Sequence, residues 1–377
     1  MKILICGAGY VGLANALMLS SKNQVTIYEI DDSKISRINS KDYSFLDEKK
    51  LEDLPIVPSN INAIDEYVSS DYDFVIIALP TNSDKNGKLD VSNIIELISD
   101  NKKKHPESIY IIRSTLPING SKKIYDSTGE FIYMPEFLRE GTAVFDSFYP
   151  SRIVIGGPKE LAVKASTLFN NCILNKPETI ITNHKEAECI KLFSNTFLAM
   201  RVAFFNELDT FFMNENLDSD TIIHGIGLDD RIGLFYNNPS FGFGGYCLPK
   251  DTEEVINSLD SKLISQINKS NLYRIENIVK HLLNLGHKKI GVYKLSAKSG
   301  ANGIRNSSTV LLIGELKKHG IEVIVYDSST NRMIGYQYAE SVIQLFEMTD
   351  LVIANRIDDE IKEYKDKVFT RDLFARD

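Results

Sequence analysis

The sequence lacks long apolar runs, and this absence excludes one class of protein. None of its segments reaches the roughly 18 apolar residues that a helix needs to span a bilayer. The apolar run at residues 3–6 is too short, and has too little positive charge beside it, for a secretory signal. We therefore expect a cytoplasmic protein that has no membrane partner.

Cysteine is also scarce. The four cysteines, Cys6, Cys172, Cys189 and Cys247, are widely spaced along 377 residues. They form neither a metal-binding pattern nor a disulfide framework, so reduced thiols in a cytoplasm are the expectation. We predict no bound metal.

Positive charge is in deficit, with 43 basic against 51 acidic residues and a net charge of −8. This balance argues against non-specific binding to nucleic acid. It does not exclude a basic pocket for an anionic substrate, because net charge does not describe the inside of a cleft. The apolar fraction of 43% is typical of a globular chain. At this length, two or three domains are expected.

Short apolar strands alternate with helical segments at both ends of the chain. In the first part a helix is predicted at 12–21, and the predicted strands are residues 2–6, 24–28, 74–79, 110–113, 131–133 and 152–155. In the last part a helix is predicted at 307–319, and the predicted strands are residues 290–294, 322–326 and 351–355. Such alternation builds a mostly parallel sheet with helices on both faces. Between the two parts, residues 186–213 contain neither Gly nor Pro and are apolar around most of a helix. A long buried central helix is predicted there, packed in a core or against a second copy of the chain.

A glycine-rich loop follows the first predicted strand. Gly7-Ala8-Gly9-Tyr10-Val11-Gly12 has the G-x-G-x-x-G pattern and opens a helix. The glycines allow a tight turn, close approach of a pyrophosphate and close packing of helix on strand. Glu29 ends the second strand, where a carboxylate accepts hydrogen bonds from a ribose 2′-OH and repels a 2′-phosphate. The pattern favours NAD over NADP, and the alternative is a glycine turn without a dinucleotide.

A second glycine-rich stretch ends in a cysteine. Gly242, Gly244 and Gly245 let the backbone bend closely around a ligand, and Cys247 stands just before Leu248-Pro249, a typical helix start. A thiol at a helix N-terminus, with a lysine nearby, is a good nucleophile. The alternative is a small buried cysteine, which most free cysteines are. The residues alone leave both open.

Several longer motifs identify a family that the chain resembles over nearly its whole length. They are residues 7–12, Pro135-Glu136-Phe137-Leu138-Arg139-Glu140-Gly141, Tyr149-Pro150-Ser151-Arg152-Ile153, Lys191-Leu192-Phe193-Ser194-Asn195-Thr196, Phe204-Phe205-Asn206-Glu207-Leu208-Asp209, residues 244–251 and Arg371-Asp372-Leu373-Phe374. In this order they resemble the UDP-glucose 6-dehydrogenase family, especially its short bacterial members. The resemblance implies the α/β class, with two Rossmann-like doubly wound domains joined by a long central helix and a helical dimerisation region. The implied domains are an NAD-binding domain at 1–183, a central domain at 184–284 and a UDP-sugar-binding domain at 285–377.

The resemblance implies a reaction and a set of catalytic residues. UDP-glucose would be oxidised to UDP-glucuronate with reduction of two NAD⁺, and Cys247 would hold the intermediate as a thiohemiacetal and then a thioester. Lys191 and Asn195 would stabilise the oxyanion; as i and i+4 they share one helix face. Asp251, Thr115 and Glu140 would position water or assist hydrolysis. Other interpretations remain: Lys191 as a stem over a core, Asp251 as a first-turn helix acid, and Thr115 as a turn residue.

The resemblance also implies binding residues. The NAD contacts would be Gly7, Gly9, Tyr10, Val11, Gly12, Glu29, Lys34, Thr81, Thr115, Glu140, Lys250 and Arg305. The UDP-glucose contacts would be Glu136, Phe137, Leu138, Arg139, Glu140, Lys191, Asn195, Tyr236, Asn237, Asn238, Pro239, Ser240, Gly244 and Lys298, with Arg231 reaching the sugar from the partner in a homodimer. The chain departs from many members at Asn302 and Gly303, which replace paired aspartates, and at Glu29, which replaces a frequent aspartate.

Three rival functions remain open. Dehydrogenases of UDP-N-acetylmannosamine or GDP-mannose share both glycine loops. A non-enzymatic NAD-binding redox sensor would use Cys247 as an oxidisable thiol but offers no reason for Lys191 and Asn195. A dehydrogenase that stops at an aldehyde or ketone would release one NADH for each substrate.

Overall fold

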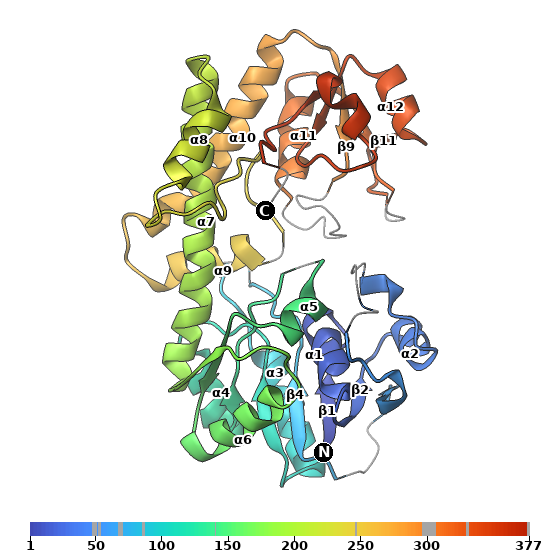
Figure 1. The fold of residues 1–377 in the computed structure, drawn as a ribbon, viewed down its shortest axis with the longest axis vertical. Coiled ribbons are helices and arrows are strands. Elements are labelled where there is room, and N and C mark those ends of the chain that lie inside the picture. The colour runs from blue at the N-terminus through green and yellow to red at the C-terminus, as the bar shows by residue number, and fades with distance from the viewer. Residues whose placement is uncertain are drawn as a thin grey trace. The chain divides into compact units, whose positions relative to one another are not determined.

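A computed structural model of the chain describes residues 1–46, 51, 54–66, 71–84, 87–139, 141–245, 247–295, 307–328 and 332–374. The chain forms two compact units, residues 1–193 and 194–377 (Figure 1). The boundary lies within the long helix α7 (His184–Asn214). The predicted division into three domains at 183 and 284 is a different partition of the chain, and it stays a prediction.

The first unit is built on an eight-stranded sheet with the order β3-β2-β1-β4-β5-β6-β7-β8. Its strands are β1 (Lys2–Cys6), β2 (Gln24–Tyr28), β3 (Ile61–Ile64), β4 (Phe74–Ile77), β5 (Ile109–Ile112), β6 (Ile132–Tyr133), β7 (Arg152–Gly156) and β8 (Glu178–Thr182). All neighbours pair in parallel except β6 and β7. The order of the first six strands is that of a dinucleotide-binding doubly wound sheet.

Helices cover both faces of this sheet. They are α1 (Tyr10–Ser20), α2 (Asp32–Asn39), α3 (Ser92–Lys104), α4 (Gly120–Thr128), α5 (Ala143–Phe148) and α6 (Lys159–Asn170). Along β1, Ile3 and Ile5 face one core, and Leu4 and Cys6 face the other. Helices α1, α2, α5 and α6 pack on the first face, and α3, α4 and the start of α7 on the second. Strands that are buried on both faces read as continuous apolar runs, which made β1, β4 and β5 recognisable in the sequence.

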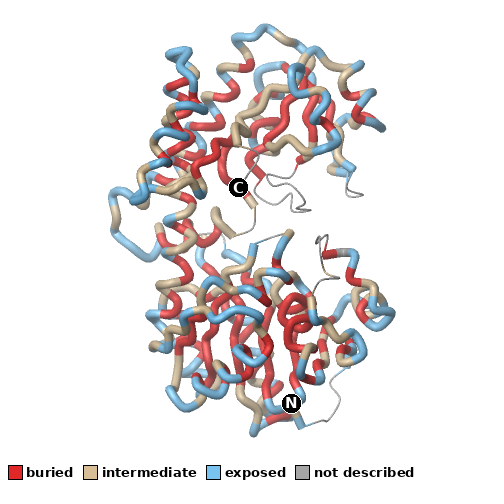
Figure 2. The backbone as a smooth tube through the Cα atoms, viewed as in Figure 1, coloured by how far each residue is buried: buried red, intermediate tan, exposed pale blue. Residues whose placement is uncertain are grey.

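The second unit has a five-stranded parallel sheet with the order β11-β10-β9-β12-β13. Its strands are β9 (Lys289–Tyr293), β10 (Glu322–Tyr326), β11 (Gln337–Tyr338), β12 (Leu351–Ala354) and β13 (Val368–Phe369). Helices α10 (Ile267–Asn284) and α11 (Ser308–Lys318) pack on one face, and α12 (Val342–Met348) packs on the other. The remaining α-helices of the described residues are α8 (Ser219–Gly227) and α9 (Cys247–Ser258). Figure 2 shows how the strands of each sheet are buried.

The predicted α/β class is confirmed, with two sheets that are parallel except between β6 and β7, and a long central helix. Helix α7 covers the predicted residues 186–213 and extends slightly beyond them. The prediction left open whether this helix packs in a core or against a second copy of the chain; within this chain Phe197, Phe204 and Phe211 expose 53%, 55% and 54% of their surface, so these three rings do not pack in a core. Within the described ranges, no helix combines the length and apolar character needed to cross a membrane.

Candidate active site

The glycine loop connects β1 to α1 at the carboxyl edge of the first sheet. Gly7 has φ +103°, a left-handed conformation that favours glycine. A Cβ on Gly12 would lie 1.9 Å from the carbonyl oxygen of Gly7, so only glycine fits there. A Cβ on Gly9, in contrast, would meet no described heavy atom within 4 Å. The surface above Gly9 is therefore open to a pyrophosphate, and Tyr10 begins the helix whose N-terminus would face it.

Glu29 lies against this loop, directly after β2. Its Oε2 accepts a hydrogen bond of 2.7 Å from the backbone N–H of Ala8, and its Oε1 accepts one of 2.9 Å from Ile30. Lys34 on α2 places its Nζ 3.8 Å from Oε2. The carboxylate thus both braces the glycine loop and stands where an adenosine ribose hydroxyl would be accepted. The sequence pattern predicted only the second of these roles.

Thr81 and Thr115 lie at the same edge, beyond the ends of β4 and β5. The Thr81 hydroxyl donates a hydrogen bond of 2.8 Å to the carbonyl of Thr115. Because β4 pairs with β1, both threonines belong to the strand ends nearest the glycine loop. Val11 packs against the core beneath the loop. These residues fit NAD: an open glycine turn, a helix N-terminus and a carboxylate stand at the topological switch point of the sheet.

Lys191 and Glu136 form a buried ion pair in the first unit. The Lys191 Nζ lies 3.0 Å from Glu136 Oε1 and donates a 2.6 Å hydrogen bond to the Glu136 carbonyl. Their side chains expose 3% and 8% of their surface. Burial alone would raise the pKa of Glu136, but the Lys191 ammonium, the Leu138 N–H and the Arg113 guanidinium together lower it. Glu136 was predicted as a substrate contact; its contact with Lys191 joins residues far apart in the chain, so no local pattern in the sequence indicated it.

The three residues that follow Glu136 have different surroundings. Two cations lie near the Phe137 ring. The Lys191 Nζ is 5.5 Å from the ring centroid, and the Arg152 guanidinium carbon is 3.8 Å from it. Leu138 packs against the core of the first unit. Arg139 is exposed and its guanidinium is held by Asp146 through hydrogen bonds of 3.0 and 2.7 Å. Glu140, Lys298 and Arg305 lie outside the described residues.

The second unit gathers Cys247, Asp251 and Asn195. Cys247 is the first residue of α9, at the predicted helix start, and is half-buried. Asp251 stands one turn later on the same helix and is fully buried. Its Oδ2 accepts a hydrogen bond of 2.6 Å from the Asn195 amide, and its Oδ1 lies 3.3 Å from Lys250 Nζ. Asn195 is on α7, one turn after Lys191, so the predicted i and i+4 spacing falls on a continuous helix.

A pocket in the second unit contains much of the predicted substrate segment. Its lining residues are Val202, Tyr236, Asn238, Ser240, Gly242, Phe243, Gly244, Leu248, Asn355 and Arg356. Tyr236 has φ +58°, which turns the chain sharply at the start of the segment. The buried Asn237 does not line the pocket; its side chain bonds to Arg201 and to the Gly233 carbonyl. Pro239 contacts Arg356 through its carbonyl.

Asn355 and Arg356 were missed in the sequence. They follow β12, which is the neighbour of β9 at the topological switch point of the second sheet. Ligands of doubly wound sheets bind outside the carboxyl ends of strands at such a point. The strand at residues 351–355 was predicted, but only the strand order shows that its end meets the pocket. Arg231, in contrast, is exposed and paired with Asp229 at 2.6 Å.

Comparison with known proteins shows to which family the chain belongs. A sequence profile of the UDP-glucose/GDP-mannose dehydrogenase family, NAD binding domain, matches residues 1–173. The central domain profile of the same family matches residues 185–273. The structure of a UDP-glucose dehydrogenase from the hyperthermophilic archaeon Pyrobaculum islandicum has a TM-score of 0.87 at 24% identity and covers 99% of this chain and 95% of that chain. This structural similarity confirms the predicted fold.

Two relatives match along their whole length. The UDP-glucose 6-dehydrogenase of Campylobacter jejuni is 39% identical over 395 residues, and that of Streptococcus pneumoniae is 35% identical over 394 residues. Both alignments cover 100% of either chain. The predicted family resemblance and the NAD cofactor are confirmed, and the protein is an NAD-dependent oxidoreductase. This chain belongs to the UDP-glucose/GDP-mannose dehydrogenase family.

Proposed function

We propose that this protein oxidises the C6 alcohol of UDP-glucose to the carboxylate of UDP-glucuronate. The similarity to UDP-glucose 6-dehydrogenases along the whole chain supports this substrate. The observation that carries the proposed chemistry is the placement of Cys247 on the first turn of α9, one turn before the buried Asp251. The partial positive charge of a helix N-terminus favours a thiolate there.

The proposed reaction has two oxidations and one hydrolysis. The alcohol carbon first loses a hydride and its hydroxyl a proton, which gives an aldehyde. The Cys247 thiolate adds to the aldehyde carbon, and loss of a second hydride converts the thiohemiacetal into a thioester. Water then cleaves the carbon–sulfur bond and releases the carboxylate and the thiol. NAD, when bound, accepts one hydride in each oxidation.

The proposed roles of the other residues follow from their charge and partners. The Lys191 ammonium and the Asn195 amide donate hydrogen bonds to the oxygen that becomes negative in each addition step. Asp251 holds the Asn195 amide in place and orients water for hydrolysis. Thr81, Thr115, Glu29 and the glycine loop bind NAD. The pocket bounded by Tyr236, Asn238 and Arg356 accepts the UDP moiety, where an arginine suits a diphosphate.

We also propose a homodimer that forms through α7. The exposed rings of Phe197, Phe204 and Phe211 repeat along this helix within the second unit. Rows of exposed aromatic residues are rare on monomeric proteins and typical of interfaces. In that dimer the exposed Arg231 would reach the sugar bound by the partner subunit. The four cysteines form no disulfide among the described residues, which supports a reducing cytoplasm as the compartment.

A panel of nucleotide sugars tests the substrate. The purified protein is incubated with NAD⁺ and UDP-glucose, UDP-N-acetylmannosamine or GDP-mannose, and NADH absorbance is followed. We expect kcat/KM for UDP-glucose to exceed the others by about a hundredfold, because buried polar groups of a pocket that fit one sugar stay unpaired with another. A higher kcat/KM for either competitor would overturn the proposed substrate.

A further inference from the structure

The carboxyl-terminal segment, residues 370–374, bonds directly to the loop that lines the pocket. We call residues 236–243 the substrate loop. The Asn238 amide donates a hydrogen bond of 2.6 Å to Asp372 Oδ1, and Asn238 Oδ1 accepts hydrogen bonds from the backbone N–H of Leu373 at 3.0 Å and of Phe374 at 3.3 Å. Asn238 is also a lining residue of the pocket. The orientation of a pocket residue is therefore set from the end of the chain.

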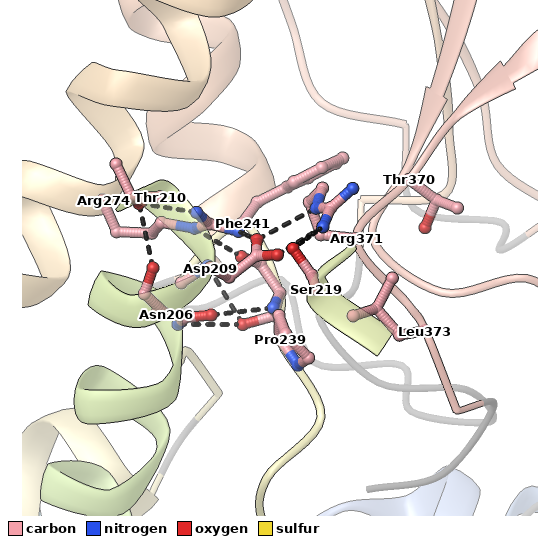
Figure 3. Close-up of polar contacts among 12 residues, drawn as sticks. Asn206, Asp209, Thr210, Ser219, Pro239, Phe241, Arg274, Thr370, Arg371 and Leu373 are labelled. Atoms are coloured by element: carbon pink, nitrogen blue, oxygen red, sulfur yellow. Dashed lines mark hydrogen bonds and ion pairs between the residues drawn. The ribbon is translucent and has the colours of Figure 1, made fainter. Parts of the chain in front are cut away.

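A second connection runs through a buried carboxylate. Arg371 donates to Asp209 from Nε at 2.9 Å and also from Nη2, and it contacts the Ser219 hydroxyl at 3.1 Å. Asp209 also pairs with Arg274, whose Nε donates a 2.9 Å hydrogen bond to the Ser240 carbonyl. Figure 3 shows the two arginines approaching Asp209 from opposite sides. One fully buried carboxylate thus links the segment to the backbone of the substrate loop.

The other backbone groups of the substrate loop are held in the same manner. The Ser240 N–H donates to Asn206 Oδ1 at 2.8 Å, and the Phe241 N–H donates to Asn355 Oδ1 at 2.9 Å. The loop has no regular helix or strand to fix its shape. Buried backbone groups need partners, so side chains from α7, α10, the end of β12 and the segment define its conformation.

A purely structural role would leave the affinity of the pocket unchanged. Leu373 and Phe374 do pack against a small core with Phe205, Phe212 and Ile223, which anchors the end of the chain. Asp372 is different, because its carboxylate bonds to Asn238 and, at 3.2 Å, to the N–H of Ile357, next to the pocket residue Arg356. Its two oxygens therefore hold one residue that lines the pocket, Asn238, and the residue that follows another, Arg356.

We propose that Asp372 and Arg371 are positioning residues for the substrate loop and thereby set the affinity for the nucleotide sugar. Neither residue lines the pocket itself. This inference rests on the proposed function, because it takes the pocket to be the site of the UDP moiety. It predicts that changes at the end of the chain act on KM for the sugar nucleotide rather than on the chemical steps.

The test measures binding of UDP-glucose by calorimetry, without NAD⁺, to the full chain and to three variants. Asp372→Ala removes both acceptors and is expected to weaken binding about tenfold, the usual effect of leaving one buried donor without its charged partner. Asp372→Asn keeps an oxygen for the Asn238 amide but loses an acceptor for Ile357, so its effect is intermediate. Asp366→Ala removes an exposed carboxylate and is the matched control, with unchanged binding.

Kinetics and melting temperatures complete the test. The KM for UDP-glucose is expected to rise in Asp372→Ala while kcat and the KM for NAD⁺ change by less than about twofold. Should Asp372→Ala fail to fold, the graded loss in Asp372→Asn decides. Unchanged UDP-glucose affinity in a destabilised variant would overturn the positioning role alone. Failure of the unaltered protein to bind UDP-glucose would overturn the proposed function and, with it, this inference.

Discussion

Lys191 is a cation that is almost fully withdrawn from water, and Glu136 provides its counter-charge. Burying an unpaired ammonium is so costly that such a group usually loses its proton. The 3.0 Å ion pair with Glu136 and the hydrogen bond to its carbonyl offset the cost of burying the ammonium. A charged donor that is already desolvated and oriented is the arrangement that stabilises a developing oxyanion most.

Replacement of Lys191 by methionine tests this role. We expect kcat with UDP-glucose to fall by about 100- to 1000-fold, the effect of removing one oxyanion donor. The KM for NAD⁺ should change little. Lys185→Met, at an exposed position in the first turn of the same helix, is the control and should keep full activity. A kcat for Lys191→Met within a few-fold of the unaltered enzyme would contradict the assignment.

Asp209 is a second buried charge, and its ionisation affects the stability of the folded protein. Burial alone would raise the pKa of this carboxyl, but Arg371 and Arg274 together lower it below the ordinary value of 3.8. A group whose pKa is depressed on folding stabilises the native state fully above its unfolded pKa. That stability is lost as the pH falls from the ordinary value through the lower folded value.

Asp209→Asn should therefore change both the amount of stability and its pH dependence. We expect a loss of about 3 kcal/mol at neutral pH, because the buried Arg274 and the partly buried Arg371 lose their charged partner. Between neutral pH and the acid range, the free energy of unfolding of the variant should fall less steeply than that of the unaltered protein. Parallel curves in urea unfolding experiments at several pH values would show that Asp209 does not titrate as described.

At the scale of elements, two glycines in the turn from β1 into α1 have different roles. Gly12 allows the helix to pack on the loop, whereas the space above Gly9 is open. Gly9 has φ −76°, so an alanine there brings no backbone strain. Gly9→Ala should thus fold normally but raise the KM for NAD⁺ by about tenfold or more, because its Cβ occupies the approach of the pyrophosphate.

Gly314→Ala is the matched control for this change. Gly314 lies in α11, and a Cβ there also meets no described heavy atom within 4 Å. Alanine should stabilise this helix by up to about 1 kcal/mol and leave the KM for NAD⁺ unchanged. Equal KM values for NAD⁺ in the two variants would argue against dinucleotide binding at the glycine loop.

The sequence predicted the inner strands of the sheets better than the edge strands. Strands β1, β2 and β10 begin and end as predicted, because their apolar residues are flanked by clear turns. The strands β3 and β8 were missed. They are the two edges of the first sheet, and an edge strand needs fewer apolar residues. The two-residue strands β11 and β13 are too short to give a pattern.

Site residues, like strands, could be predicted only where a local pattern in the sequence marks them. The glycine loop and the cysteine at a helix start are contiguous motifs, so their geometry could be anticipated. The contact of Glu136 with Lys191 and the place of Arg356 in the pocket depend on folding together distant segments. No local pattern encodes such contacts. The roles predicted for Glu140, Lys298 and Arg305 stay predictions.

At the scale of the whole molecule, the proposed dimer can be tested at α7. Phe204→Glu places a charge in the middle of the exposed row of rings and should shift the protein from dimer to monomer in analytical ultracentrifugation. Ile343→Glu, at an exposed position on α12, is the control and should sediment like the unaltered protein. An unaltered protein that sediments as a monomer would disprove the dimer.

The central claim is that one bound substrate undergoes two oxidations, with Cys247 holding the intermediate between them. The most direct measurement is the amount of NADH formed from a limiting, known amount of UDP-glucose in the presence of excess NAD⁺. Our account predicts two molecules of NADH for each molecule of UDP-glucose, UDP-glucuronate as the product, and loss of this turnover in Cys247→Ala. One NADH for each UDP-glucose, or full turnover without the Cys247 thiol, would contradict it.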